Sequence, residues 1–545
     1  MFIIKMHKVL MPMQPLKRIN HLWIGSGMLL DFKHNSRFYS SKTATVSSIP
    51  DFGDHVEIFR HHSIRELSRA VLVLHLCGVE TLVTNSYKLL KVGERILGQR
   101  GLAVVTSPLY RQFVAGNSGE ELRRACARLE PRAIRLMIAP MLETDVGEKN
   151  ETQMFSTNLM RMVKFLGMTA ADGSIAAAPG SSPPAPAVCQ AKVTGHISAD
   201  IMEKVSKPYS AMDMDERLKA VQWTVDVMTT LDTDMNLKKE SHGNDTCDIL
   251  NPKGSTISEI CSSENSPLSG LLMSWKGSEC DALAKASPFS DVLNSEEMNE
   301  FLCGLRRFSL FGMLAEDLGI AMAVDAEFTY VNPCINLVSV ALMVRNNKLK
   351  PVIWNTYQGY LTESRQWLEE DAQLAERLGC CFGVKLVRGA YMDHERLLAK
   401  QNGQLDPVQP TYDATNRNYD GIAEEQIMAV HKNPDRRLIL LASHNEDTVK
   451  KALGKLSSLP NLPPTHGHHL CFAQIYGMGD NITMPLASSG ALVYKSVPLG
   501  TVSEVLPYLA RRASENRSVL QGARREKQLL MRALRDRMMM SSRAA

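Results

Sequence analysis

The chain has 545 residues and a net charge of +4 at pH 7, which is enough length for one large domain or several ordinary ones. Residues 1–50 hold seven lysines and arginines against a single acid, Asp31, so the rest of the chain carries about −2 and offers no basic footprint for nucleic acid. No run of about 18 apolar residues predicts a membrane-spanning helix, and eleven cysteines without a CxxC pair argue against a disulfide framework or a zinc site.

Residues 1–45 have the features of a mitochondrial presequence. The segment is basic and poor in acids, its apolar runs are short, and "NSRFYSSK" combines arginine, aromatic and serine residues as processing sites do. An ordinary disordered terminus has a similar composition and stays open as an alternative. We expect a mitochondrial protein whose folded part follows this segment.

Residues 56–130 predict a helical arm. In "IRELSRAVLVLHL" and "SGEELRRACARLE" apolar residues recur every three or four positions, with few helix breakers. Further along, 172–187 and 238–270 are rich in Pro, Gly, Ser and Asn, so we predict two flexible insertions there.

Residues 131–520 alternate short apolar runs with amphipathic helices. Such a repeat with nearly continuous apolar strands predicts a parallel sheet covered by helices. The eight runs are "AIRLMIAP", "VCQAKVTG", "IAMAVDAE", "PVIWNTYQ", "CFGVKLVRG", "RLILLASHN", "LCFAQIYG" and "ALVYKSVP". Eight strands, and no Gly-rich turn after the first, favour a closed, TIM-like (βα)8 barrel of the α/β class over an open doubly wound sheet.

Each predicted strand ends in polar residues. Parallel strands bring their carboxyl ends to one edge, where barrel enzymes place their active sites. The strand-end residues are Lys192, Asp325, Glu327, Gln358, Lys385, Arg388, His444, Asn445, Gln474, Tyr494 and Lys495. We expect them to surround one barrel mouth.

Arg511 and Arg512 stand on the last predicted helix of the barrel, which folds back to that mouth. Glu515 lies three and four residues further on, so the three form either a surface ion-pair ladder or part of a site. Two adjacent guanidiniums at a barrel mouth suit a substrate carboxylate.

Other polar groups leave alternatives open. Lys192 is either a Schiff-base former or a strand-end lysine whose stem is buried. Asp325 follows an apolar run and needs a partner, for which Lys192 or an arginine is the candidate. His444 is a base or a hydrogen-bonding residue beside the cap Asn445. The histidines of "HGHH" (466–469) have no carboxylate at ligand spacing, so we expect no metal site.

Residues 521–545 predict a basic amphipathic tail. Leu530, Ala533 and Leu534 share one face and arginines the other, so this helix either lies on a membrane surface or packs on the protein.

Taken together, these segments resemble the proline dehydrogenase family. The matching pieces are "RQFVAGNSGEEL", "VDAE", "NTYQGYL", "FGVKLVRGAYMDHER", "PTYDATNRNY", "ASHNEDTVKKAL", "GMGD" and "YLARRASENRSVL". The resemblance implies a distorted (βα)8 barrel with an N-terminal helical arm and a C-terminal helix over the mouth. It also implies noncovalent FAD, oxidation of a cyclic amino acid, and transfer of electrons to ubiquinone.

The resemblance assigns roles to individual residues. It implies Asp325 and Lys385 as catalytic residues and a substrate site made of Lys192, Tyr391, Ile475, Ser496, Arg511 and Arg512. It implies that FAD contacts Gln358, Lys385, Val387, Arg388, Gly389, Ala390, Ser443, His444, Asn445, Gln474 and Glu515. Bacterial members carry arginine at the position of Lys385, and a lysine keeps the charge without the fork geometry.

Ser496 decides between two branches of the family. Proline-specific members carry tyrosine there, in a pattern like YKYVPYG, whereas "YKSVPLG" and "ENRSVLQGARRE" resemble the hydroxyproline dehydrogenase branch. Serine opens space and adds a small hydroxyl, as a hydroxylated ring requires. Leu499 stands where a tyrosine is usual in both branches and leaves proline open as the substrate.

We therefore expect oxidation of trans-4-hydroxy-L-proline on the matrix side of the inner mitochondrial membrane, with peripheral membrane association and no nucleic-acid partner. A Schiff-base lyase that uses Lys192, and a catalytically silent barrel that acts as a binding partner, are the alternatives from other classes.

Overall fold

The computed structural model describes residues 49–140, 151–173, 186–242, 272–460, 469–515 and 517–544. The predicted presequence and most of the two predicted insertions lie outside these residues. The helices that border the insertions run further than predicted, since α6 (Glu151–Gly173) and α8 (Met214–His242) enter the ranges 172–187 and 238–270. In α8 the reason is local, because Lys and Glu in "KKESH" favour continuation of a helix.

A group of helices precedes the first strand. These are α1 (His55–Ile58), α2 (Ile64–Cys77), α3 (Glu80–Thr84), α4 (Ser86–Phe113) and α5 (Gly119–Leu129). A capping box starts α2: Ser63 Oγ accepts the Glu66 N–H at 3.2 Å, and the Glu66 carboxylate accepts the Ser63 N–H at 2.8 Å.

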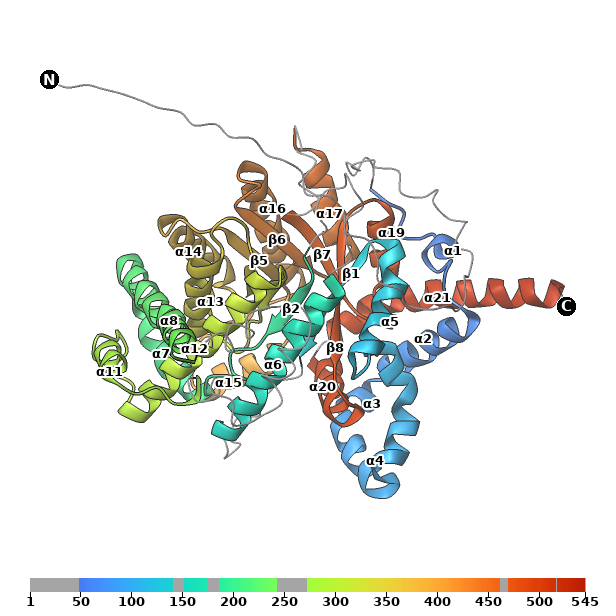
Figure 1. Cartoon of the computed structure of the whole chain (residues 1–545). Coiled ribbons are helices and arrows are strands. Elements are labelled where there is room, and N and C mark those ends of the chain that lie inside the picture. Colours follow the sequence, from blue (N-terminus) through green and yellow to red (C-terminus); the bar gives the residue numbers. More distant parts are fainter. Residues whose placement is uncertain are drawn as a thin grey trace, which may run out of the picture. The chain divides into compact units, whose positions relative to one another are not determined.

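The helix α4 is a hairpin of two helical arms. Its backbone turns at Gly98, where φ is 66°, a conformation that glycine adopts without strain. The arms then pack closely, because a Cβ added to Gly93 would lie only 3.1 Å from Leu102 Cδ1. In Figure 1 this hairpin lies at the lower edge of the view.

Eight parallel strands form a closed barrel in sequence order, which confirms the predicted fold (Figure 1). They are β1 (Ile134–Pro140), β2 (Val188–Ala191), β3 (Ala321–Val324), β4 (Ile353–Gln358), β5 (Phe382–Val387), β6 (Arg437–Ala442), β7 (Leu470–Ile475) and β8 (Leu492–Leu499). The ring closes through β1 and β8, where Ile134 pairs with Val493 and Pro140 with Leu499.

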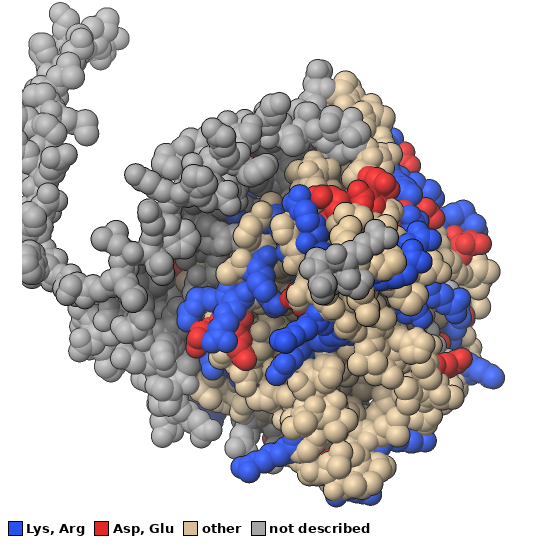
Figure 2. All heavy atoms as spheres, turned by 90° about the vertical axis from the view of Figure 1, so that its right-hand side faces the viewer, with Lys and Arg blue, Asp and Glu red and all other residues tan. Residues whose placement is uncertain are grey.

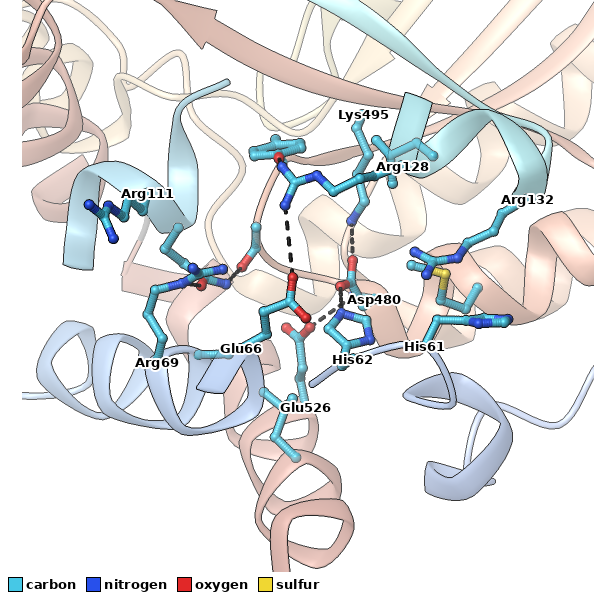
Figure 3. A pocket seen from close by; sticks show the side chains of 17 residues that line it. His61, His62, Glu66, Arg69, Arg111, Arg128, Arg132, Asp480, Lys495 and Glu526 are labelled. Carbon is cyan, nitrogen blue, oxygen red and sulfur yellow. Dashed lines mark hydrogen bonds and ion pairs between the residues drawn. The ribbon is translucent and has the colours of Figure 1, made fainter. Parts of the chain in front are cut away.

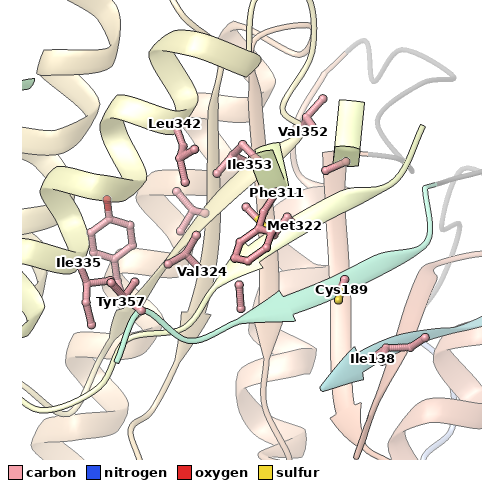
Figure 4. Packing of buried hydrophobic residues seen from close by; sticks show 14 of the residues in the cluster. Ile138, Cys189, Phe311, Met322, Val324, Ile335, Leu342, Val352, Ile353 and Tyr357 are labelled. Carbon is pink, nitrogen blue, oxygen red and sulfur yellow. The ribbon is translucent and has the colours of Figure 1, made fainter. Parts of the chain in front are cut away.

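Alternate residues of each strand fill the barrel or face the helices. The interior cluster includes Met137, Trp354 and Tyr494, all at most 1% exposed. The outward residues join a larger cluster in which Met322 and Ile353 pack with Phe311 of α12 (Ser295–Asp317) (Figure 4). The strand period of two therefore separates an inner column, which leads up to the mouth, from an outer packing layer.

The other helices of the described residues lie around the outside of the barrel (Figure 1). They are α7 (Ala199–Ala211), α11 (Ser278–Lys285), α12 (Ser295–Asp317), α13 (Asn332–Asn346), α14 (Ser364–Arg377), α15 (Met392–Gln401), α16 (Tyr412–Lys432), α17 (Glu446–Ser457) and α19 (Asp480–Ser488). Asn445 caps α17 as predicted, since its side chain accepts the N–H groups of Asp447 and Thr448. Across the described residues, no helix is both long and apolar enough to cross a membrane.

Two helices follow the barrel: α20 (Val502–Glu515) and α21 (Arg517–Ala544). The helix α21 packs against α2 and buries Leu529, Leu530 and Ala533 in the outer core. His55 Nε2 also contacts Asp536 at 2.9 Å. Part of the predicted amphipathic tail is thus joined to the arm.

Candidate active site

Four side chains form a hydrogen-bonded network at the barrel mouth. Lys385 Nζ donates to Asp325 Oδ1 and to Gln190 Oε1, each at 2.6 Å. Gln190 Nε2 in turn donates to Ser496 Oγ at 2.9 Å. The network joins β2, β5 and β8 to the residue that follows β3. It places three residues predicted for the site, Asp325, Lys385 and Ser496, around a glutamine that the sequence analysis missed.

The partner of Asp325 differs from the one expected. The sequence predicts Lys192 or an arginine as the partner, but Asp325 pairs with Lys385, whose side chain is only 8% exposed. The reason is geometric, since Lys385 belongs to the inner column of β5 and reaches across the barrel. A buried ammonium held by a carboxylate and an amide oxygen is well compensated.

Lys192 instead reaches Tyr391, at the start of α15. Its Nζ lies 3.4 Å from the Tyr391 hydroxyl, which accepts the hydrogen bond. The Tyr391 ring packs at 4.3 Å between centroids on Phe328. A cation and an aromatic wall predicted for the substrate therefore lie together, beyond β2 and β5.

A second chain of hydrogen bonds positions Gln358 at the end of β4. Thr194 Oγ1 donates to Glu327 at 2.7 Å, the Glu327 N–H donates to Asn332 Oδ1 at 2.8 Å, and Asn332 Nδ2 donates to Gln358 Oε1 at 2.8 Å. Gln358 is buried, and its contact with Asn332 uses the amide oxygen.

Arg388 is held beyond the end of β5 by neutral oxygens. Its guanidinium donates to Ser443 Oγ at 2.6 Å, Thr448 Oγ1 at 2.8 Å and Asn416 Oδ1 at 3.0 Å. It also lies 4.4 Å from the centre of the Tyr419 ring. Among the described residues no carboxylate forms an ion pair with it, so the charge of Arg388 is positioned but not neutralised.

Glycine is required next to this arginine. Gly389 has φ of 138°, and a Cβ there would overlap the Tyr360 ring at 1.5 Å. Its neighbours Val387 and Ala390 are half-buried. Glycine at this position therefore lets the Tyr360 ring pack directly on the backbone of the "VRGAY" turn.

His444 is a neutral hydrogen-bond acceptor. The backbone N–H of Ile475 donates to His444 Nε2 at 3.0 Å, so the ring proton sits on Nδ1. Burial lowers the pKa of His444 to about 3, and the nearby charges of Lys495 and Arg388 act in the same direction. At neutral pH this histidine does not act as a general acid, and it links the ends of β6 and β7.

Gln474 lies on the outer face of β7, in register with Lys495. Its Nε2 donates to the Ser443 carbonyl at 3.2 Å, and its Oε1 accepts the Thr483 hydroxyl at 2.9 Å. The side chain is buried and both ends of its amide are used within the protein. It therefore fixes the backbone of Ser443, which itself binds Arg388.

The expectation that Tyr494 and Lys495 reach the mouth was wrong. Tyr494 lies inside the barrel and donates to the Pro186 carbonyl at 2.8 Å, before the start of β2. Lys495 points outward, where it pairs with Asp480 at 2.8 Å and donates to the Met478 carbonyl. The reason is that β8 continues to Leu499, so these residues lie in its middle and not at its end.

Lys495 lines a cavity of about 200 Å³ outside the barrel (Figure 3). The cavity lies between α2, the base of α4, α19 and α21, and contains arginines together with Glu66, Asp480 and Glu526. Burial raises the pKa of Glu526 to about 7, as does the neighbouring Asp480. Of the described residues to which the family resemblance gives a catalytic, substrate-binding or flavin-binding role, none lines this cavity.

Some predicted residues cannot be placed. The backbone of Arg511, Arg512 and Glu515 belongs to α20, but their side chains lie outside the described part of the structure. His466 and His468 also fall outside it. Within the described residues, no group of three or more His, Cys, Asp or Glu is arranged to hold a metal ion.

Sequence reasoning missed Gln190, Asn416 and Thr448. Gln190 had a detectable signal: it is a polar residue inside an apolar strand, two positions before Lys192 and hence on the same face. Asn416 and Thr448 project from α16 and α17, and nothing in the local sequence indicates that they meet Arg388.

The chain is similar to curated relatives over almost its whole length. It is 33% identical to the hydroxyproline dehydrogenase of Xenopus laevis, over 88% of this chain and 89% of the relative. It is 32% identical to the human hydroxyproline dehydrogenase, over 87% and 91%. The human protein named proline dehydrogenase 1, mitochondrial, is 30% identical over 90% of each chain.

A solved structure supports the fold. Proline utilization A from Bdellovibrio bacteriovorus aligns with a TM-score of 0.51 and 18% identity, over 88% of this chain and 39% of that larger chain. The family model described as "Proline dehydrogenase" matches residues 123–525, which include every strand of the barrel and the helix α20. This chain therefore belongs to the proline dehydrogenase family.

Proposed function

We propose that this protein is a flavoenzyme that oxidises trans-4-hydroxy-L-proline to 3-hydroxy-1-pyrroline-5-carboxylate and passes the electrons to ubiquinone. The observation that carries the proposal is the hydroxyl of Ser496, held by Gln190 beside the Lys385–Asp325 pair. The identity of 32–33% to relatives named hydroxyproline dehydrogenase supports it further.

The hydroxyl of Ser496 suits a substrate that carries a hydroxyl of its own. Because Ser496 Oγ accepts the hydrogen bond from Gln190, its own proton remains available to donate to a ligand. A site with a polar group aimed at a substrate hydroxyl discriminates against an analogue that lacks the hydroxyl, since the group is then left unpaired. Proline is thus the poorer substrate in this proposal.

The donor set at the ends of β5 and β6 fits FAD. Arg388 is a fixed cation that pairs with no carboxylate of the described residues, as a site for a diphosphate requires. We assign Gln358, Lys385, the turn 387–390, Ser443, His444, Asn445 and Glu515 to the flavin, with Gln474 holding Ser443 in place. When bound, FAD supplies the acceptor for the hydride that leaves C5 of the ring.

The protein residues orient the substrate and adjust its charge. Arg511 and Arg512 bind the carboxylate and so fix which ring carbon is presented for oxidation. Tyr391 and Ile475 bound the ring. The amine has to be neutral before C5 releases a hydride, and the ammonium groups of Lys192 and Lys385 favour the neutral amine.

We propose further that the protein works in the mitochondrion, on the matrix side of the inner membrane, where ubiquinone is available. The basic, acid-poor segment 1–45 supports import. The relative named proline dehydrogenase 1, mitochondrial, is consistent with this location.

The test is a flavin assay on the purified protein. The purified protein should show the absorbance spectrum of a flavin. Heat or acid should then release noncovalent FAD into the supernatant. Borohydride treatment in the presence of hydroxyproline tests the lyase alternative. A covalent adduct on Lys192, in a protein that carries no flavin, would overturn the proposal.

A further inference from the structure

The hairpin α4 exposes an unusual number of large apolar side chains. Ile96 and Val104 are each 75% exposed, although they lie on regular helical arms. The exposed apolar residues of the hairpin are Tyr87, Leu89, Val92, Ile96, Leu97, Val104 and Val105. No described part of the chain covers them. Apolar surface of this extent on a folded domain marks a binding surface.

The hairpin is also strongly basic. The exposed side chains of Lys88, Lys91, Arg95 and Arg100 alternate with the apolar ones, and Glu94 is the one acid of α4. In Figure 2 the lower edge of the molecule, where α4 lies, is mostly uncharged surface with blue lysine and arginine spheres at its border. Apolar residues among cations match the interface of a bilayer that contains anionic lipid.

Positive charge argues against two other partners for this surface, a second copy of the chain and its own N-terminal segment. In a second copy, the facing hairpin would carry the same excess of positive charge, so two hairpins repel each other. Residues 1–48 of this chain are basic as well, with seven lysines and arginines against Asp31. An anionic lipid surface offers both complementary charge and a place for the apolar side chains.

The hairpin is rooted beside the barrel mouth. Tyr110 Oη donates to the carbonyl of Gly500 at 2.7 Å, one residue after β8 ends. Ser86 Oγ, at the other end of α4, lies 3.5 Å from the Ala510 carbonyl of α20. The hairpin is therefore attached to the helix that carries Arg511 and Arg512, and its free end at Gly98 projects away from it.

We propose that the α4 hairpin is a membrane-docking element that inserts its apolar residues into the surface of an anionic bilayer. Docking there brings the barrel mouth close to the lipid phase, where ubiquinone is dissolved. The role that we give to docking rests on the proposed function. The binding test does not depend on it, because binding to a bilayer needs neither substrate nor flavin.

The test is flotation of the full chain with two kinds of vesicle, phosphatidylcholine alone and phosphatidylcholine mixed with cardiolipin. The wild type should bind the mixed vesicles, and binding should weaken as salt is added. The double variant Ile96→Glu/Val104→Glu should bind at least about tenfold less, because two charges would enter the lipid. Lys88→Glu/Lys91→Glu should weaken binding to the mixed vesicles alone.

Two matched variants control for a general loss of surface hydrophobicity. Leu349→Glu/Leu405→Glu alters two leucines that are 90% and 94% exposed elsewhere, and should bind as the wild type does. Met538→Glu/Met540→Glu alters the exposed apolar end of the basic helix α21, and should also bind normally. Activity with a water-soluble electron acceptor should be unchanged in all four double variants, which separates this proposal from the proposed oxidation.

Three results would overturn the proposal. The first is wild-type protein that binds neither kind of vesicle. The second is a hairpin variant that binds vesicles as well as the wild type does. The third is loss of vesicle binding in the α21 variant while the hairpin variants still bind. A wild type that is dimeric without lipid, and becomes monomeric in Ile96→Glu/Val104→Glu with no vesicle binding in either, would identify the hairpin as a contact between copies.

Discussion

The Nε2 of Gln190 donates a 2.9 Å hydrogen bond to the Oγ of Ser496, across the barrel mouth. The same glutamine accepts a hydrogen bond from Lys385 through its Oε1. One amide therefore connects the residue proposed to recognise a substrate hydroxyl with the ion pair at the mouth. A side chain held at both ends has its orientation fixed, so the hydroxyl of Ser496 is also fixed.

Replacing Gln190 should weaken hydroxyproline oxidation more than proline oxidation. Gln190→Met keeps the side-chain volume but removes the hydrogen bonds to Ser496 and Lys385. If the net cost is that of one hydrogen bond, about 1.4 kcal/mol, kcat/KM for hydroxyproline should fall about tenfold. Steady-state kinetics with both substrates gives the comparison. Gln426→Met on α16 alters another buried glutamine and should leave both rates unchanged.

A double-mutant cycle isolates the contact itself. Ser496→Ala should reduce kcat/KM for hydroxyproline, and the combined Gln190→Met/Ser496→Ala variant should lose less than the sum of the two single effects. Strict additivity would mean that Gln190 does not act through Ser496.

Enlarging Ser496 tests the substrate assignment. Ser496→Tyr fills the space beside the ring and removes the small hydroxyl, so it should cost activity on hydroxyproline more than on proline. The measurement is the ratio of kcat/KM for the two substrates in the variant and the wild type. Equal losses on both would refute the role of Ser496.

The arginine pair on α20 should bind the substrate carboxylate. Arg512→Met should raise the apparent substrate constant about a hundredfold, since a bidentate charged contact contributes about 3 kcal/mol, while FAD stays bound. Substrate titration of the flavin spectrum measures both effects in one sample. Arg535→Met, an exposed arginine on α21, serves as the control. Unchanged affinity in Arg512→Met would remove this residue from the clamp.

Asp371 should make the fold less stable as the pH rises. It is fully buried on α14 and accepts the Tyr357 hydroxyl at 2.7 Å, and burial raises its pKa from 3.8 to about 7. Between these values the unfolded chain loses the proton while the folded chain keeps it. Stability is therefore full below about pH 4 and falls toward pH 7, by at most about 4 kcal/mol.

Urea unfolding at pH 5 and pH 8 measures this effect. Asp371→Asn should remove much of the difference that the wild type shows between the two pH values, whereas the exposed Asp393→Asn should retain it. The same pH dependence in wild type and Asp371→Asn would mean that Asp371 is ionised in the folded protein.

The barrel could be predicted because its strands are nearly continuous apolar runs separated by amphipathic helices. Strand ends could not be located as well. Tyr494 and Lys495 lie in the middle of a strand that continues to Leu499. Because the two residues are adjacent, the Tyr494 side chain points into the barrel and the Lys495 side chain points out of it. A shift of a few residues in the predicted end of β8 was enough to place both wrongly at the mouth.

The candidate site could be predicted only in part. Polar strand ends indicated Lys385 and Asp325, but their pairing depends on which inner residues face each other across the barrel, and sequence spacing does not contain that information. For Arg388, two of the acceptors come from helices outside the barrel. Such contacts depend on how α16 and α17 pack, which is a property of the whole fold.

Anaerobic reduction of the bound flavin tests the central claim most directly. Mixing the purified protein with trans-4-hydroxy-L-proline should bleach the flavin absorbance, and L-proline at the same concentration should do so more slowly. Bleaching by hydroxyproline at the faster rate is the result we predict. A flavin that L-proline reduces faster, or that neither amino acid reduces, would contradict the account.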